Sequence, residues 1–214
     1  MKNKQYILRF IEMSIGTILS AVGIYFMIKS NLGQTTLVSL ARNIGKVVHI
    51  KDGTMMIVVN STCLIVNILI MGRNFDKKQF LQVFLALLQG QIVNIFVYDL
   101  PIFKDLVPSN YIIQWLCMLI GILLLSYGVA MMMKANIVKL SLEDLCRVIS
   151  IKYNYEFSKV RQSADIICIA VSLIIILIFS LDFSTLREGT WACMLLLGPS
   201  MKYTFKIAEK YSIS

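Results

Sequence analysis

Charged residues are scarce in this chain. They make up 15% of its 214 residues, whereas about 25% is usual for a soluble domain. Hydrophobic residues make up 57% of the chain, and its mean hydropathy is +0.75. This composition excludes an ordinary soluble domain and predicts a protein that lies within a membrane.

The residue patterns that usually carry catalysis or metal binding are also missing. His49 is the only histidine, and the sequence has no Cys-x-x-Cys pair, no His-Glu-x-x-His, no phosphate-binding glycine loop and no nucleophile elbow. The cysteines are odd in number and lie in or beside apolar runs: Cys63, Cys117, Cys146, Cys168 and Cys193. We interpret them as small packing residues rather than disulfides or metal ligands. We therefore expect no enzyme, no metal site and no cofactor.

Apolar runs of nearly 20 residues recur along the chain, and each could cross about 30 Å of hydrocarbon as a helix. They predict six transmembrane helices, at Tyr6–Ile28, Thr54–Met71, Gln79–Tyr98, Tyr111–Met133, Val160–Leu181 and Gly189–Phe205. Lys202 and the pair Gly198-Pro199 interrupt the last run, which is the weakest. The predicted fold is an all-α polytopic membrane protein.

The chain repeats itself at an offset of 105 residues, at which Ile15–Ile70 aligns with Ile120–Ile175 without a gap. By our count 14 of these 56 pairs are identical, and 16 others exchange one apolar residue for another. The sequence predicts a single membrane domain over residues 1–214, with repeats at about 6–98 and 111–207 joined by Leu100–Asn110.

The formal net charge of +9 fits membrane orientation better than nucleic-acid binding. With the N-terminus in the cytoplasm, the inner segments hold 15 of the Lys and Arg residues and the outer segments hold 6. This asymmetry predicts that both termini are cytoplasmic. Three spans in each half would make the second repeat enter the membrane inverted, with a pseudo-twofold axis in the membrane plane.

A short amphipathic helix is expected after the first span of each half. Apolar and polar residues alternate with helical spacing over Thr35–Val48 and again over Ser141–Ile151. Ser141 and Asp144 have the spacing of a helix N-cap signature. About a dozen residues cannot span a bilayer, so each helix lies in the interface or dips into the membrane and returns.

Polar residues within the spans are the candidate ligand-binding residues, because polar groups in hydrocarbon usually face protein or water. Asn60 and Asn67 occupy the same repeat positions as Asp165 and Ser172, so the two helices should face each other. The predicted site between the repeats consists of Asn60, Asn67, Gln89, Asn94, Asp165 and Ser172, with Asp165 as the coupling acid. Two structural alternatives stay open, namely that Asp165 pairs with Arg161 and that the asparagines only join helices.

Helix breaks and close helix crossings are further expectations. Breaks are predicted at Asn31, Gly33, Asn136, Gly198 and Pro199, where exposed backbone either caps a helix or forms half of a substrate site. The small residues Gly16 and Gly23 and their repeat partners Gly121 and Gly128 should let the first and fourth spans pack closely.

The repeat, with Asn31-Leu32-Gly33 after the first span and Gly189-Thr190 and Gly198-Pro199 in the last, resembles the YczE/YyaS/YitT family of small bacterial integral membrane proteins. The resemblance covers nearly the whole chain, although Gln34-Thr35-Thr36 stands where that family has Pro-x-Asp. It implies a multi-pass protein of the bacterial cytoplasmic membrane, with an acid such as Asp165 in the fifth span, and it assigns no chemistry.

Together these features favour a secondary transporter or flippase for a small solute or lipid-derived group, with proton coupling through Asp165. The alternative is a membrane accessory or substrate-binding subunit of a larger complex. The expected partners are the lipid bilayer, a small-molecule ligand and a second copy of the chain in a homodimer, with no nucleic acid.

Overall fold

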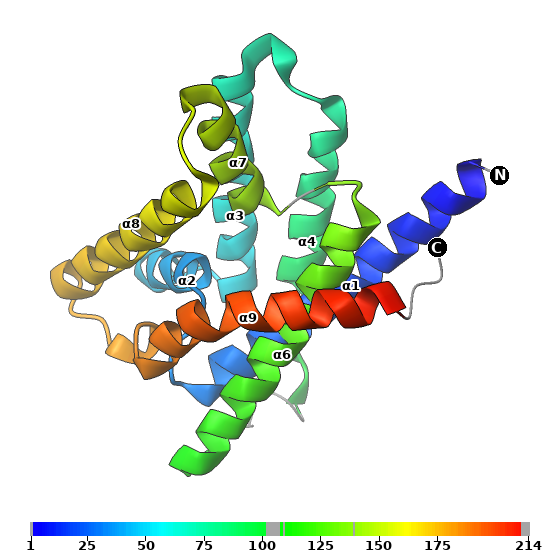
Figure 1. The fold of residues 1–214 in the computed structure, drawn as a ribbon. Helices are drawn as coiled ribbons and strands as arrows, with labels where there is room; N and C mark the ends of the chain where they lie inside the picture. Colours follow the sequence, from blue (N-terminus) through cyan, green and yellow to red (C-terminus); the bar gives the residue numbers. More distant parts are fainter. Residues whose placement is uncertain (1, 102–107, 109, 139, 211–214) are drawn as a thin grey trace.

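The computed structural model describes residues 2–101, 108, 110–138 and 140–210, and within these residues it is built from eight α-helices (Figure 1). Most of the predicted connection Leu100–Asn110 lies outside the described residues. The first half contains α1 (Lys2–Ser30), α2 (Thr36–Val48), α3 (Asp52–Met71) and α4 (Leu81–Asn94). The second half contains α6 (Tyr111–Ala135), α7 (Ser141–Tyr153), α8 (Phe157–Ile178) and α9 (Glu188–Lys210). Single turns at Gly72–Asn74, Lys77–Phe80 and Phe183–Thr185 connect helices, and a π-helix at Ile95–Asp99 extends α4.

Five helical segments of the described chain are long and apolar enough to cross a membrane, so the chain is a multi-pass membrane protein. They are Gln5–Ser30, Asp52–Met71, Lys77–Asp99, Tyr111–Ala135 and Phe157–Ile178. Helix α9 covers the sixth predicted span but is not among them. Lys202 and the pair Gly198-Pro199 interrupt its apolar run. A sixth span remains a prediction.

The repeat in the sequence is also present in the helix boundaries. Helices α2 and α7 begin and end 105 residues apart, and α1 and α6 both end one residue before an asparagine. Those asparagines, Asn31 and Asn136, have left-handed backbones with φ of 56° and 49°, which asparagine tolerates better than most residues. The next pair of helices also ends at equivalent left-handed residues, His49 and Asn154. The two halves therefore stop and restart their helices at the same points.

Glycines bring α1 and α6 into close antiparallel contact. A Cβ added to Gly16 would lie 2.6 Å from the carbonyl oxygen of Gly128, and one added to Gly23 would lie 2.7 Å from that of Gly121. Residue numbers thus rise along α1, from Gly16 to Gly23, while those of the facing residues fall along α6, from Gly128 to Gly121. Helix contacts across the two halves are exchanged in the same way, because α2 packs on α8 and α7 packs on α3.

One contact breaks this symmetry. In the first half α3 packs along α4, whereas in the second half α8 has no comparable contact with α9 (Figure 1). A Cβ added to Gly53 would lie 2.0 Å from the carbonyl oxygen of Gly90, so the two helices touch through these glycines. The position in α9 equivalent to Gly90 is Gly198, where an added Cβ would meet nothing within 4 Å.

Helix α9 also differs from the sequence prediction at this point. Its helical backbone runs through Gly198 and Pro199, so the helix does not break there. Proline costs a helix one N–H donor and crowds the carbonyl one turn earlier. The helix continues despite this cost, and Gly198 presents no Cβ to the neighbouring proline ring.

We predict that Gly16→Ala destabilises the fold, because its new methyl group would overlap the Gly128 carbonyl. Overpacking of this kind costs about 1–3 kcal/mol, which outweighs the helix-propensity gain of about 1 kcal/mol from replacing glycine. Thermal unfolding in detergent should show a lower midpoint for Gly16→Ala. The control variant Ser163→Ala, at an exposed position of α8, should be neutral or slightly stabilising, and equal midpoints for both variants would contradict the crossing described here.

Candidate functional site

A cleft of about 580 Å³ lies between the second-half helices and the start of α2. We call it the wide cleft. Its lining residues are Thr35, Thr36, Val129, Met133, Leu140, Glu143, Arg147, Ser150, Phe157, Arg161, Asp165, Cys193, Met194, Leu197, Gly198 and Met201. A cleft of this size can hold a small organic molecule.

The two walls of the wide cleft differ in chemistry. Helices α7 and α8 supply the charged groups, Glu143 and Arg147 from α7 and Arg161 and Asp165 from α8. The opposite wall is apolar and comes from α6 and α9, with the side chains of Val129, Met133, Met194, Leu197 and Met201. The cleft therefore offers separate surfaces to a charged group and to a hydrocarbon group.

Asp165 is already engaged by two donors. The Arg161 guanidinium donates to its Oδ1 atom, and so does the Thr36 hydroxyl from the first turn of α2. The Thr36 bond links the two halves of the chain. Arg161 also lies 3.7 Å from a carboxylate oxygen of Glu143, an ion pair without hydrogen-bond contact. Desolvation raises the pKa of Glu143, and the positive charge of Arg161 opposes this rise.

A second carboxylate, Asp144, lies behind the charged wall and is only 1% exposed. Its Oδ2 atom accepts hydrogen bonds from Asn67 of α3 at 2.7 Å and from Gln82 of α4 at 3.1 Å. Its Oδ1 atom accepts one from Arg147 at 3.0 Å. This network, which we call the Asp144 network, fastens α7 to both α3 and α4. Sequence reasoning treated Asp144 only as part of a helix N-cap, although Arg147 at i+3 was a signal for an ion pair.

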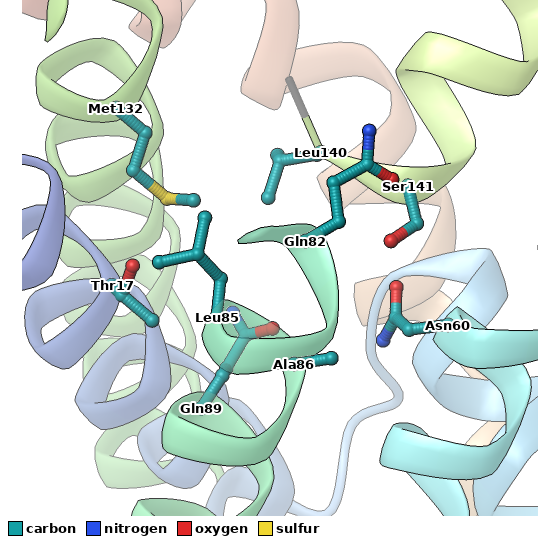
Figure 2. A pocket seen from close by; sticks show the side chains of 9 residues that line it. All are labelled: Thr17, Asn60, Gln82, Leu85, Ala86, Gln89, Met132, Leu140 and Ser141. Atoms are coloured by element: carbon teal, nitrogen blue, oxygen red, sulfur yellow. The ribbon is translucent and has the colours of Figure 1, made fainter. Parts of the chain in front are cut away.

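A much smaller cavity lies between the first-half helices and the start of α7. We call it the narrow cleft, and Thr17, Asn60, Gln82, Leu85, Ala86, Gln89, Met132, Leu140 and Ser141 line it (Figure 2). Its volume of about 10 Å³ is close to the minimum needed for one water molecule. Gln82 and Gln89 enter from α4, while Asn60 approaches from α3.

The two clefts are repeat-related versions of one site. Asn60 of the narrow cleft is equivalent in the 105-residue repeat to Asp165 of the wide cleft. In the same way, Ser141 of the narrow cleft is equivalent to Thr36 of the wide cleft. The last helices align at an offset of 108, fixed by Gly90 and Gly198. At that offset Leu85, Ala86 and Gln89 correspond to Cys193, Met194 and Leu197, which also line the wide cleft. The same site is thus wide in one repeat and nearly filled in the other.

The six predicted ligand-binding residues are distributed over several places. Asn60 and Gln89 meet at the narrow cleft, Asp165 lies in the wide cleft and Asn67 belongs to the Asp144 network. Asn94 accepts a hydrogen bond from the Gly53 N–H at 2.8 Å and donates to Thr54 at 2.9 Å, which ties α4 to α3. Ser172 is fully buried, and its hydroxyl has no hydrogen-bond partner among the described atoms.

The segment that follows α1 is fastened to α9. The N–H of Gly189 donates to the carbonyl oxygen of Leu32 at 2.8 Å, and the Gln34 N–H donates to the Thr190 hydroxyl at 3.3 Å. Gly33 has a φ of +107°, which favours glycine, and a Cβ there would lie 2.3 Å from the Thr190 hydroxyl oxygen. These contacts anchor the N-terminal end of α9, while Gly198 further along lines the wide cleft.

Nothing in the described part of the chain resembles a metal centre, since no three His, Cys, Asp or Glu side chains gather there. All five cysteines are free thiols, and Cys193 lines the wide cleft.

We predict that Asp144→Asn destabilises the protein by about 2 kcal/mol, the usual contribution of hydrogen bonds to a charged group. An asparagine has one acceptor oxygen, so it cannot accept from Asn67 and Gln82 on one side and from Arg147 on the other, and it also loses the ion pair with Arg147. Chemical unfolding in mixed micelles measures this difference. Asp182→Asn is the control, because Asp182 pairs with Lys46 on the surface, and its loss should cost less than about 1 kcal/mol. Equal effects of the two substitutions would show that the Asp144 network does not hold the helices together.

The whole of residues 7–206 matches the model of a family described as a family of unknown function, DUF6198. No curated protein matches the chain, and no solved structure matches it. The match covers both repeats and both clefts, so the chain belongs to the DUF6198 family.

Proposed function

We propose that the protein is a secondary transporter or flippase that moves a small solute or lipid-derived group by alternating access. The observation that carries this proposal is the difference between the two repeat-related clefts, about 580 Å³ against about 10 Å³. Two equivalent sites need two arrangements of the same helices, and a transporter built from repeats uses both in turn. In the other arrangement, the narrow cleft would widen as the wide cleft closes.

The glycine contacts indicate which helices would move. The narrow cleft is closed where α3 meets α4 at Gly53 and Gly90, and the wide cleft is open where α8 stands away from α9. Ser158 and Gly198 occupy the positions equivalent to Gly53 and Gly90. Both second-half residues are small, so α8 and α9 could approach closely in the same manner.

The antiparallel crossing of α1 and α6 supports the opposite orientation of the two halves in the membrane. If both helices span the bilayer, the clefts beside them open toward opposite faces, as alternating access requires. The proposed topology has six spans, with α9 as the sixth and both termini in the cytoplasm, as the distribution of Lys and Arg favours. We also propose that the chain is related to the YczE/YyaS/YitT proteins.

Spin labels can detect the proposed exchange. Labels at Ser163 and Tyr203 report the distance between α8 and α9. The repeat-equivalent labels, at Val58 and Ile95, report the distance between α3 and the π-helix that extends α4. All four residues are exposed. In a variant without native cysteines, double electron–electron resonance in nanodiscs should show two distances between the labels of each pair.

The proportions of the two states are the decisive readout. The long α8–α9 separation should accompany the short α3–α4 separation, so any condition that depletes one should deplete the other. A single fixed separation in both pairs under all conditions would contradict alternating access. It would favour a static accessory subunit instead.

Asp165 is the proposed coupling acid. Glu143, Arg161 and Asp165 together carry one net negative charge, and a proton taken up by this cluster makes it neutral, so that closing the cleft against the apolar wall of α9 costs less. We therefore predict that acidification increases the closed α8–α9 population and that Asp165→Asn, which removes the extra negative charge, makes this population independent of pH. The control is Asp99→Asn, an exposed carboxylate paired with Lys51, which should retain the pH response. Retention of the response in Asp165→Asn would remove Asp165 from the coupling mechanism.

A further inference from the structure

We infer that the wide cleft binds a zwitterionic amphiphile, with its head group on Glu143 and Arg147 and its hydrocarbon chain on the α6 and α9 wall. This inference deepens the transport proposal, on which it rests for its biological role, by naming the class of substrate. The binding itself follows from the two walls of the cleft and can be tested without transport.

The apolar wall suits a hydrocarbon chain. Met133 of α6 and Met194 and Met201 of α9 line it together with Leu197. Methionine side chains are flexible and polarisable, so a surface rich in them adapts to chains of different shape. A small polar solute would leave this wall without a partner, and the wall accounts for much of the cleft lining.

The surroundings of the cleft also favour an amphiphile over a freely soluble ligand. The cleft lies between α8 and α9, which do not pack along each other. Both helices carry highly exposed apolar side chains, including Ile166 at 63% and Leu195 at 74%. In a multi-pass membrane protein such side chains contact lipid, so the cleft lies between two lipid-facing helices.

Two of the charged residues in the wide cleft are available to bind a head group. Asp165 already accepts from Thr36 and Arg161. Glu143 makes a 3.7 Å ion pair with Arg161 and accepts a hydrogen bond from its own backbone N–H, and its side chain is 34% exposed. Arg147 is 38% exposed, and its hydrogen bonds within the described chain use only Nε and Nη2. Glu143 and Arg147 therefore have capacity for a ligand.

Their spacing matches a head group with two neighbouring opposite charges. The two residues are four positions apart on α7, which places their Cβ atoms about 5–6 Å apart on one face of the helix. An ammonium group could bind Glu143 while an adjacent phosphate or carboxylate binds Arg147. A purely anionic head group would be repelled by Glu143, and a purely cationic one by Arg147.

Native mass spectrometry of the full chain in an uncharged maltoside detergent tests this inference. The probes are short-chain phosphatidylethanolamine, the anionic phosphatidylglycerol of the same chain length, a cationic trimethylammonium lipid of that length, and free phosphorylethanolamine. We expect the zwitterionic lipid to bind most tightly. Glu143→Gln and Arg147→Gln should each weaken it about tenfold or more, the loss of one charge-assisted hydrogen bond.

The control variant is Lys159→Gln, because Lys159 is a highly exposed cation of α8 that does not line the wide cleft. It should bind the zwitterionic lipid as the unchanged protein does. Arg147 also belongs to the Asp144 network, so Glu143→Gln decides the outcome if Arg147→Gln lowers the unfolding temperature. Unchanged binding by Glu143→Gln overturns the inference.

The remaining probes separate the other outcomes. If the anionic or cationic lipid binds as tightly as the zwitterionic lipid or more tightly, the cleft does not select a zwitterionic head group and the inference is wrong. If free phosphorylethanolamine binds as tightly as the lipid, the hydrocarbon chain does not contribute to binding and the inference is wrong in that part. None of these results would alter the spin-label separations, so failure of this inference is distinguishable from failure of the transport proposal.

Discussion

The antiparallel crossing of α1 and α6 determines how the two halves of the chain lie relative to each other. Gly16 with Gly128 and Gly23 with Gly121 are exchanged by the 105-residue repeat, so at this crossing each half meets its own equivalent. Larger residues at these four positions would separate the helix backbones. The other main helix contact between the halves occurs in two versions, α2 with α8 and α7 with α3.

The two versions are not equally polar. In the α7–α3 version, the buried carboxylate of Asp144 accepts from Asn67. The equivalent residues in the α2–α8 version are Ser39 and Ser172, and Ser39 donates instead to the Thr185 carbonyl at 2.7 Å. The narrow cleft is thus bordered by a charged network that reaches α4, while the wide cleft has no counterpart at the same position. This difference gives a physical reason why the narrow cleft is the closed one.

The sequence was sufficient for those features that depend on local or periodic signals. The repeat, the short amphipathic helices and the left-handed residues Asn31 and Asn136 follow from spacing and from asparagine's backbone tolerance. The grouping of polar side chains did not follow, because the sequence fixes which face of a helix is polar but not which helix lies opposite. Asn94 therefore joins α4 to Gly53 of α3 rather than lining a shared site.

The same limit explains the residues that sequence reasoning missed or misplaced. Asp144 lies on a short helix outside the predicted spans, and its partners Asn67 and Gln82 are more than 60 residues away along the chain. Pro199 suggests a helix break when read alone, but α9 continues through it. The Asp144 network depends on packing between distant segments.

The most direct test of the account is whether α8 and α9 can adopt the contact that α3 and α4 already make. In a variant whose native cysteines are alanine, S158C with G198C places thiols at the positions equivalent to Gly53 and Gly90, and N94C with T54C places them where two side chains already meet at 2.9 Å. Alternating access predicts that mild oxidation in membranes crosslinks both pairs, the first more slowly than the second. Crosslinking of the second pair alone would show that the wide cleft does not close.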